Sequence, residues 1–262
     1  MLDFLLSNRY SISKIYLTPF ELMKLKKIKK KIKDKVVFIL GSAPNPDLSL
    51  YSKDYILASI NGSAKNAKEL GLNNPTITLI DFELINKDTA SSKDVRSIII
   101  KNKVLKNLDL GDLIAVQSNN TLIDDYSLLE ANINSFFSIH RLTRKIIVKK
   151  ISKNKNLDKT EASLLSTGGF LCALSFYLGA KEVVLSGFSF LKENGSTPPV
   201  FYKMNDSKLS ISNKENTINT LDTRSHSLSD SCLIASLIIN GYKISSREKS
   251  IMPLIQNWGN PK

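Results

Sequence analysis

His226 and Asp230 are the residues of this sequence best placed for proton transfer, within the stretch RSHSLSDS at 224–231. Side chains four residues apart share one face of a helix, so the Asp230 carboxylate could orient the His226 imidazole. The N-terminus of a helix disfavours imidazolium, which keeps His226 neutral and able to accept a proton. The structural alternative is that Asp230 forms a capping box with Ser227. The stretch therefore predicts a general base.

Small and polar residues follow three predicted strands, at the edge where α/β proteins bind ligands. Gly41, Ser42 and Ala43 follow the apolar run VVFIL, Asn61 follows YILASI, and Asp81 follows PTITLI. Gly41 permits close backbone approach, and the N–H groups of a following helix attract an anion. An amide and a carboxylate at neighbouring strand ends suit a base and a ribose. Each of these residues could instead serve only a turn or a helix cap.

A third group of small residues flanks the apolar block between residues 164 and 190. Ser166 or Thr167 is predicted to cap a helix that begins near Gly169, which leaves hydroxyl and N–H groups at the same edge. Gly187 ends the predicted strand KEVVLSG, where the absence of a Cβ leaves room for a flat ring against the main chain. Close packing of the helix on the strand is the structural alternative.

Strand and helix patterns alternate along the chain from residue 36 onward. The predicted strands cover 36–41, 55–62, 75–81, 96–100, 112–118, 181–187 and 242–246, and the predicted helices cover 63–71, 132–152, 166–179 and 227–241. Strands separated by helices form parallel sheets through right-handed crossovers. We therefore expect the α/β class, as a single Rossmann-like domain with a mostly parallel sheet.

The composition divides the chain into a basic N-terminal segment, residues 1–35, and an α/β domain, residues 36–262. The first 35 residues carry ten Lys and Arg against three Asp and Glu, a net charge of +7, and the remainder supplies +6 of the total of +13. Within the domain, residues 191–222 are rich in Pro, Asn and Ser and lack periodicity, as is typical of an inserted lid.

Residues 20–35 read as an amphipathic helix with a narrow apolar stripe of Leu22, Leu25, Ile28 and Ile32 among eight lysines. Such a helix suits the surface of an anionic membrane. The alternative is that the stripe docks on the body of the protein. Because aromatic residues are not interleaved with the lysines, we do not expect nucleic-acid binding.

Several other classes of protein are disfavoured by missing motifs. The sequence has neither a Gly-x-Gly-x-x-Gly fingerprint nor a P-loop, no Gly-x-Ser-x-Gly elbow and no Cys/His cluster, and its nearest approach to a metal-binding Asp-x-Asp is DFE at 81–83. We expect a reaction without a metal or other cofactor. Cys172 and Cys232 lie in apolar helical patterns, and no long apolar run or signal peptide is present, so we expect a cytoplasmic protein, peripheral to the membrane at most.

In order along the chain, VVFILGSAPNPDL, ASING, LIDFEL, STGGFLCALSFYLGAKEVVLSGFSF, NGS and RSHSLSDS resemble the bacterial sialyltransferases of glycosyltransferase family 42. The resemblance spans about residues 36–245. It implies a metal-independent, inverting transferase that moves a sialic-acid-type sugar from a CMP-activated donor to a hydroxyl of a surface glycan, either free or linked to lipid. The donor contacts that it implies are Gly41, Ser42, Ala43, Asn61, Asp81, Ser166, Thr167, Gly168, Gly187 and Phe188.

This sequence differs from the family pattern at its reactive positions. Asp230 stands where the family has its catalytic His, so either Asp230 or His226 is the base. Leu164 replaces the Arg that precedes the Ser-Thr-Gly-Gly stretch. The family's two phosphate-binding tyrosines fall at about Leu191 and Thr197, so Tyr202 or Lys203 could take their place. The alternatives are a transferase for another CMP-ulosonate (pseudaminic, legionaminic or ketodeoxyoctonic acid) and a non-catalytic nucleotide-binding accessory protein.

Overall fold

The computed structural model describes residues 19, 21–43, 45–81, 104–116, 130–153, 165–188, 226–249 and 251–258, and for 226–228 and 258 only the backbone. The strand predicted at 96–100, the lid predicted at 191–222, and residues Tyr202 and Lys203 lie outside this part of the chain.

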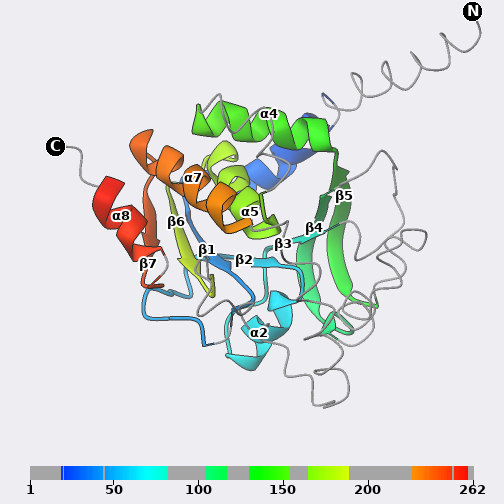
Figure 1. Cartoon of the computed structure of the whole chain (residues 1–262). Helices are drawn as coiled ribbons and strands as arrows, with labels where there is room; N and C mark the ends of the chain where they lie inside the picture. The colour runs from blue at the N-terminus through cyan, green and yellow to red at the C-terminus, as the bar shows by residue number, and fades with distance from the viewer. Residues whose placement is uncertain are drawn as a thin grey trace, which may run out of the picture.

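The described strands form one sheet of seven parallel strands in the order β5-β4-β3-β2-β1-β6-β7 (Figure 1). The strands are β1 (Val36–Leu40), β2 (Ile56–Ile60), β3 (Ile77–Asp81), β4 (Asp109–Val116), β5 (Asn132–Ile139), β6 (Glu182–Ser186) and β7 (Ile244–Ser246). Continuous apolar runs form the central strands because both faces of a parallel sheet are covered. The expected α/β, Rossmann-like fold is confirmed.

Helices cover both faces of the sheet (Figure 1). The helices are α2 (Ser63–Glu69), α4 (Arg141–Ser152), α5 (Thr167–Tyr177), α7 (His226–Ile239) and α8 (Met252–Trp258). Alternate residues of β1 separate the two layers, since Val37 and Ile39 pack with α5 and α7, whereas Phe38 and Leu40 pack with Ala67 of α2. The α5 helix is buried along almost its whole length, which explains why its sequence is apolar on all sides.

The helix predicted over 132–152 is wrong in its first half. Residues 132–139 form β5, which pairs with β4, and α4 begins only after His140. The spacing of Ile133, Phe136 and Phe137 also fits a helix, but pairing with the edge of the sheet decides their conformation. His140 separates the two elements, because its Nδ1 accepts a hydrogen bond from the main-chain nitrogen of Leu142, 3.1 Å away, and so caps α4.

The apolar stripe of the N-terminal helix, residues 21–32, docks on the body of the protein. Leu25, Ile28 and Ile32 are buried in the same core as the sheet and α5. The carboxylate of Glu21 accepts hydrogen bonds from the His140 main-chain nitrogen, at 3.0 Å, and from the Thr143 hydroxyl. Of the two interpretations of this stripe, membrane insertion is therefore wrong, because its side chains already pack against protein.

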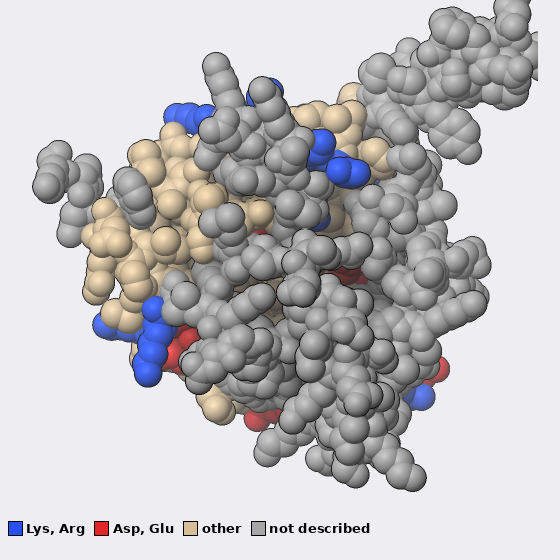
Figure 2. Space-filling model, viewed as in Figure 1, with Lys and Arg blue, Asp and Glu red and all other residues tan. Residues whose placement is uncertain are grey.

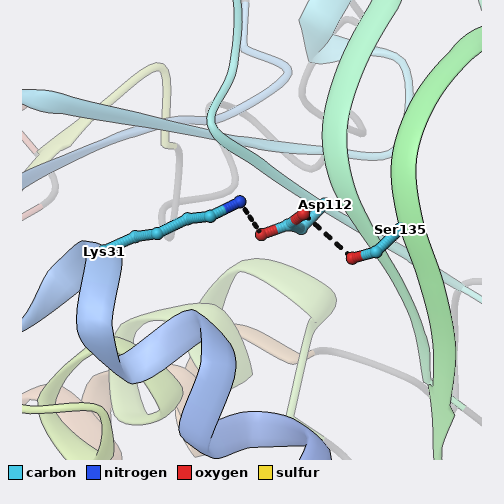
Figure 3. Close-up of polar contacts among 3 residues, drawn as sticks. All are labelled: Lys31, Asp112 and Ser135. Atoms are coloured by element: carbon cyan, nitrogen blue, oxygen red, sulfur yellow. Dashed lines mark hydrogen bonds and ion pairs between the residues drawn. The ribbon is translucent and has the colours of Figure 1, made fainter.

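A partly buried ion pair ties the same helix to the sheet (Figure 3). The Lys31 Nζ lies 2.6 Å from Oδ2 of Asp112 on β4, and the Ser135 hydroxyl of β5 donates to Oδ1 of the same carboxylate at 2.9 Å. Asp112 is buried, whereas the Lys31 side chain is 44% exposed. The N-terminal helix is thus held by apolar packing at its centre and by charged contacts at both ends.

Two further expectations concern cysteines and membrane spans. Cys172 and Cys232 are free thiols, and Cys172 is fully buried in α5, where burial first and the nearby Asp230 second raise the pKa of its thiol. Among the helices that the structure describes, none has the length and apolarity needed to cross a bilayer.

Candidate functional site

The carboxyl ends of β1 and β6 mark the point where the chain direction across the sheet reverses. Strands β1 to β5 follow one another toward one edge, and β6 then returns to the other side of β1. In open α/β sheets the connections diverge at such a point and leave room for a ligand. Gly41 and Gly187, both predicted as site residues, lie there.

The two glycines bring the strand ends into backbone contact. The main-chain nitrogen of Ala43 donates to the carbonyl oxygen of Gly187 at 2.8 Å, and a Cβ on Gly41 would come closer than 3.0 Å to that carbonyl. Gly187 has φ +73°, which is unfavourable for any residue with a side chain. The ring of Phe188 lies beside both Gly41 and Gly168. Close packing of the backbone thus explains both glycines, which allow the ends of β1 and β6 to approach each other at this edge.

Glu248, which the sequence analysis missed, binds the main chain at the same edge. Its Oε1 accepts from the Gly187 main-chain nitrogen at 2.5 Å and lies 3.4 Å from the Asp47 nitrogen and 3.5 Å from the Ser186 hydroxyl. This carboxylate therefore joins the loops that follow β1, β6 and β7. Nothing local in the sequence marks it, because its partners lie 61 and 201 residues away along the chain.

Asn61 and Asp81 lie together at the ends of β2 and β3. The Asn61 side-chain oxygen accepts a hydrogen bond from the main-chain nitrogen of Asp81 at 3.0 Å. Asn61 has φ +47°, a left-handed conformation that Asn tolerates better than most residues. Asn61 thus links the ends of β2 and β3 and does not cap α2, whose N-cap is Gly62, and the half-buried Asp81 is held at the same edge.

Ser166 and Asp230 form the most closely bonded pair at this edge. The Asp230 Oδ1 accepts from the Ser166 main-chain nitrogen at 3.0 Å, and the Ser166 hydroxyl donates to Oδ2. The Ser166 hydroxyl also accepts from the Gly169 nitrogen at 2.9 Å, so Ser166 is the cap of α5. Asp230 is only 2% exposed, and a Cβ on Gly169 would come closer than 3.0 Å to its carboxylate.

Arg144 of α4 supplies a cation that the sequence analysis also missed. Its Nη2 donates to the carbonyl oxygen of Leu165, the residue before Ser166, and its guanidinium lies over the Phe170 ring, 5.2 Å from the ring centroid. Burial lowers the pKa of Arg144 to about 10, against the opposing effect of the Asp81 and Asp230 charges. The arginine therefore stays charged at neutral pH and interacts with both carboxylates.

The predicted donor contacts thus gather at one edge, in two groups around Gly41 and around Ser166. Thr167 and Gly168 open α5 beside Ser166, and Ser42 follows Gly41. His226 begins α7 four residues before Asp230, but its side chain lies outside the described residues. Within the described ranges, no cluster of three His, Cys, Asp or Glu side chains could hold a metal ion.

The arrangement offers three kinds of chemistry at one edge. Asp230 is a buried carboxylate held by a hydroxyl and an N–H group, Arg144 is a partly buried cation, and the first turn of α5 presents main-chain N–H groups beside Thr167. A carboxylate can accept a proton, and cations and helix N-termini stabilise negative charge. Together these groups suit proton removal coupled to the departure of an anion.

Comparison with known proteins supports the fold. No protein-family model matches this sequence, and no curated protein matches it significantly. Among solved structures, a single-residue variant of the sialyltransferase CstII in complex with CMP aligns with a TM-score of 0.53 at 17% identity, covering 86% of this chain and 84% of that one. CstII comes from Campylobacter jejuni.

Two further structures of the same enzyme agree. A second variant in complex with CMP aligns at TM-score 0.52 and 16% identity over 81% of both chains, and monomeric CstII aligns at 0.51 and 14% over 86% of this chain and 84% of that one. This chain therefore shares the fold of the sialyltransferase CstII.

Proposed function

We propose that this protein is an inverting, metal-independent glycosyltransferase that moves a sialic-acid-type sugar from a CMP-activated donor to a hydroxyl group of a bacterial surface glycan. The observation that carries the proposal is the hydrogen-bonded pair Ser166–Asp230 at the carboxyl edge of the sheet. The shared fold with an enzyme solved in complex with CMP supports the choice of donor.

The proposed donor site lies between the two groups of residues at this edge. We expect one side of the nucleotide to contact Gly41, Ser42 and Ala43. Its other side would contact Gly187 and Phe188. Asn61 and Asp81 would lie near its sugar. Because the Asn61 side-chain oxygen already accepts from the Asp81 nitrogen, this pair would contact the donor as one unit that joins the ends of β2 and β3.

Asp230 is the proposed general base. It would accept the proton of the acceptor hydroxyl while that oxygen bonds to the anomeric carbon and the bond from this carbon to the CMP phosphate breaks. Inversion follows because the acceptor attacks the face opposite the leaving phosphate. The Ser166 hydroxyl and N–H group hold the carboxylate in place, so little reorganisation is needed during reaction.

The departing phosphate gains negative charge and needs stabilisation. The first turn of α5, at Thr167 and Gly168, would supply N–H groups, and the partly buried Arg144 would supply positive charge. Residues 191–222 are the proposed lid, whose closure would protect the donor from water.

The test is a panel of CMP-sugars with product detection by mass spectrometry, applied to the wild type and to Asp230→Asn and His226→Ala. If Asp230 is the base, Asp230→Asn lowers kcat on the order of a hundredfold or more, and His226→Ala lowers it less. The opposite order identifies His226 as the base. Negligible losses in both variants contradict this site, and loss of activity in EDTA contradicts metal independence.

The same panel separates the remaining candidates. Transfer of pseudaminic, legionaminic or ketodeoxyoctonic acid in preference to sialic acid changes the sugar but not the mechanism. Calorimetric binding of CMP without transfer or donor hydrolysis would identify an accessory protein instead. The resemblance to the bacterial transferases favours the catalytic reading, and so does the buried carboxylate placed beside a helix N-terminus.

A further inference from the structure

The outward face of α4 combines exposed apolar side chains with lysines. Leu142 and Ile146 are each 38% exposed, and because they lie four residues apart they share one face of the helix. The lysines on that face are Lys145, Lys149, Lys150 and Lys153, and the span 141–153 contains no Asp or Glu. The opposite face of α4 is buried in the core through Ile147, Val148 and Ile151.

The N-terminal helix extends this surface. Its first turn contacts the start of α4 through Glu21, which binds the His140 nitrogen and the Thr143 hydroxyl. Two residues further on, Met23 is 55% exposed. Apart from Lys31, which pairs with Asp112, the exposed lysines of this helix are Lys26, Lys27, Lys29 and Lys30. In Figure 2, Lys and Arg side chains gather along the upper side of the molecule, where Figure 1 places α4.

We propose that this surface, defined by Met23, Leu142 and Ile146 and the lysines around them, binds the face of an anionic lipid bilayer. Apolar side chains among lysines are the pattern of proteins that lie on membranes, since the lysines attract lipid headgroups and the apolar groups enter the boundary with the acyl chains. The sequence alone suggested the stripe of residues 20–35 for this purpose. The structure buries that stripe, so the contact that we propose lies instead on α4 and on the outer side of the N-terminal helix.

Other occupants fit the surface less well. A second copy of this chain would bring two strongly basic faces together, and like charges repel. A nucleic acid would use the lysines but would leave Leu142 and Ile146 without a role, since single-stranded nucleic acids stack on aromatic side chains instead. The combination of charge and aliphatic side chains therefore favours lipid.

Docking through α4 would place the candidate active site close to the bilayer. On the same helix, Arg144 points inward to the Leu165 carbonyl beside Ser166, while Leu142 and Ile146 point outward. An acceptor glycan linked to lipid would then reach the site without leaving the membrane. This consequence rests on the proposed function, whereas the lipid binding itself does not.

The experiment is flotation of the full chain with vesicles of phosphatidylcholine and phosphatidylglycerol, compared with pure phosphatidylcholine. Binding is expected only to the anionic vesicles and should weaken at high salt. The double variant L142S/I146S and the triple variant K27Q/K30Q/K145Q should each lower binding about tenfold. The matched control is K65Q/K68Q, because both lysines lie on α2, which packs on the opposite face of the sheet from α4; it should bind as the wild type does.

Several outcomes would overturn the proposal. They are the absence of binding to anionic vesicles, binding that L142S/I146S leaves unchanged, and duplex DNA binding that competes with vesicles and survives L142S/I146S. A dimer in solution that L142S/I146S dissociates would also overturn it, because the surface would then bind a second copy. Transfer to a water-soluble acceptor should be unchanged in L142S/I146S, so failure of the lipid proposal is distinguishable from failure of the proposed function.

Discussion

The Asp230 Oδ1 lies 3.0 Å from the main-chain nitrogen of Ser166, 64 residues earlier in the chain. The hydroxyl of the same serine donates to the other carboxylate oxygen and accepts from the Gly169 nitrogen. The cap of α5 and the position of the carboxylate therefore depend on one side chain. Changes that move the first turn of α5 should affect stability and chemistry together.

Gly169→Ala should displace Asp230, because a Cβ at residue 169 would come closer than 3.0 Å to its carboxylate. We expect the free energy of unfolding to fall by about 1–3 kcal/mol and kcat to fall roughly tenfold or more. Urea unfolding and steady-state kinetics measure the two effects. Gly71→Ala is the control: Gly71 has φ +68° and no atom within 4 Å of the added Cβ, so it should lose stability but retain kcat.

Arg144→Met should lower kcat/KM by on the order of ten- to a hundredfold, because it removes the partly buried cation near Asp81 and Asp230. Burial lowers the pKa of the wild-type guanidinium to about 10. Below that pH the guanidinium is charged, and the free-energy cost of burying its charge is present in full. This cost is relieved only as the pH rises above 10 and the group loses its proton. The ratio of wild-type to variant kcat/KM should therefore be constant from about pH 7 to 9. Arg144→Lys should restore part of the activity, and a variant as active as the wild type would exclude an electrostatic role.

Glu21→Gln should change how stability depends on pH. Burial raises the pKa of Glu21, although its bonds to Thr143 and His140 oppose the shift. A raised carboxyl pKa means that the folded state binds the proton more tightly, so this group stabilises the protein in acid and loses that effect as pH rises through the folded-state pKa.

In urea unfolding from about pH 4.5 to 7, the wild type should therefore lose stability relative to Glu21→Gln as pH increases above the ordinary Glu value of about 4.3. Gln keeps an oxygen acceptor for the His140 nitrogen, so packing is preserved. A constant difference across this range would show that Glu21 titrates as it does in the unfolded chain.

Lys31→Met should cost about 1–2 kcal/mol of unfolding free energy, because it leaves the buried Asp112 carboxylate without its cation. The double variant Lys31→Met with Asp112→Asn should recover part of this loss, which a double-mutant cycle measures. Lys65→Met is a matched control: its lysine is also 44% exposed, but its partner Glu69 is 50% exposed, so the expected loss is about 0–0.5 kcal/mol. If the two lysine variants lose the same free energy of unfolding, the burial of Asp112 does not strengthen its ion pair with Lys31.

Local patterns were sufficient for most of the fold. The apolar runs that became β1, β2, β3 and β6 are buried on both faces, and such runs look the same in any parallel sheet. They were not sufficient at β5, where the spacing of Ile133 and Phe137 fits a helix as well as a strand. Only pairing with β4 distinguishes the two, and pairing is a long-range property.

By itself, the sequence determined the parallel α/β architecture, a helix cap at Ser166 or Thr167 and the edge where Gly41, Asn61, Asp81 and Gly187 gather, because strand direction and caps follow from local order along the chain. The tertiary structure alone decided that the Asp230 carboxylate bonds Ser166, that Arg144 and Glu248 reach the same edge, and that the N-terminal stripe is buried. The physical reason is that an amphipathic pattern shows which face of a helix is apolar but not which surface covers that face. In the same way, the residues next to a charged side chain in the sequence do not show which distant residue it will bind in the fold.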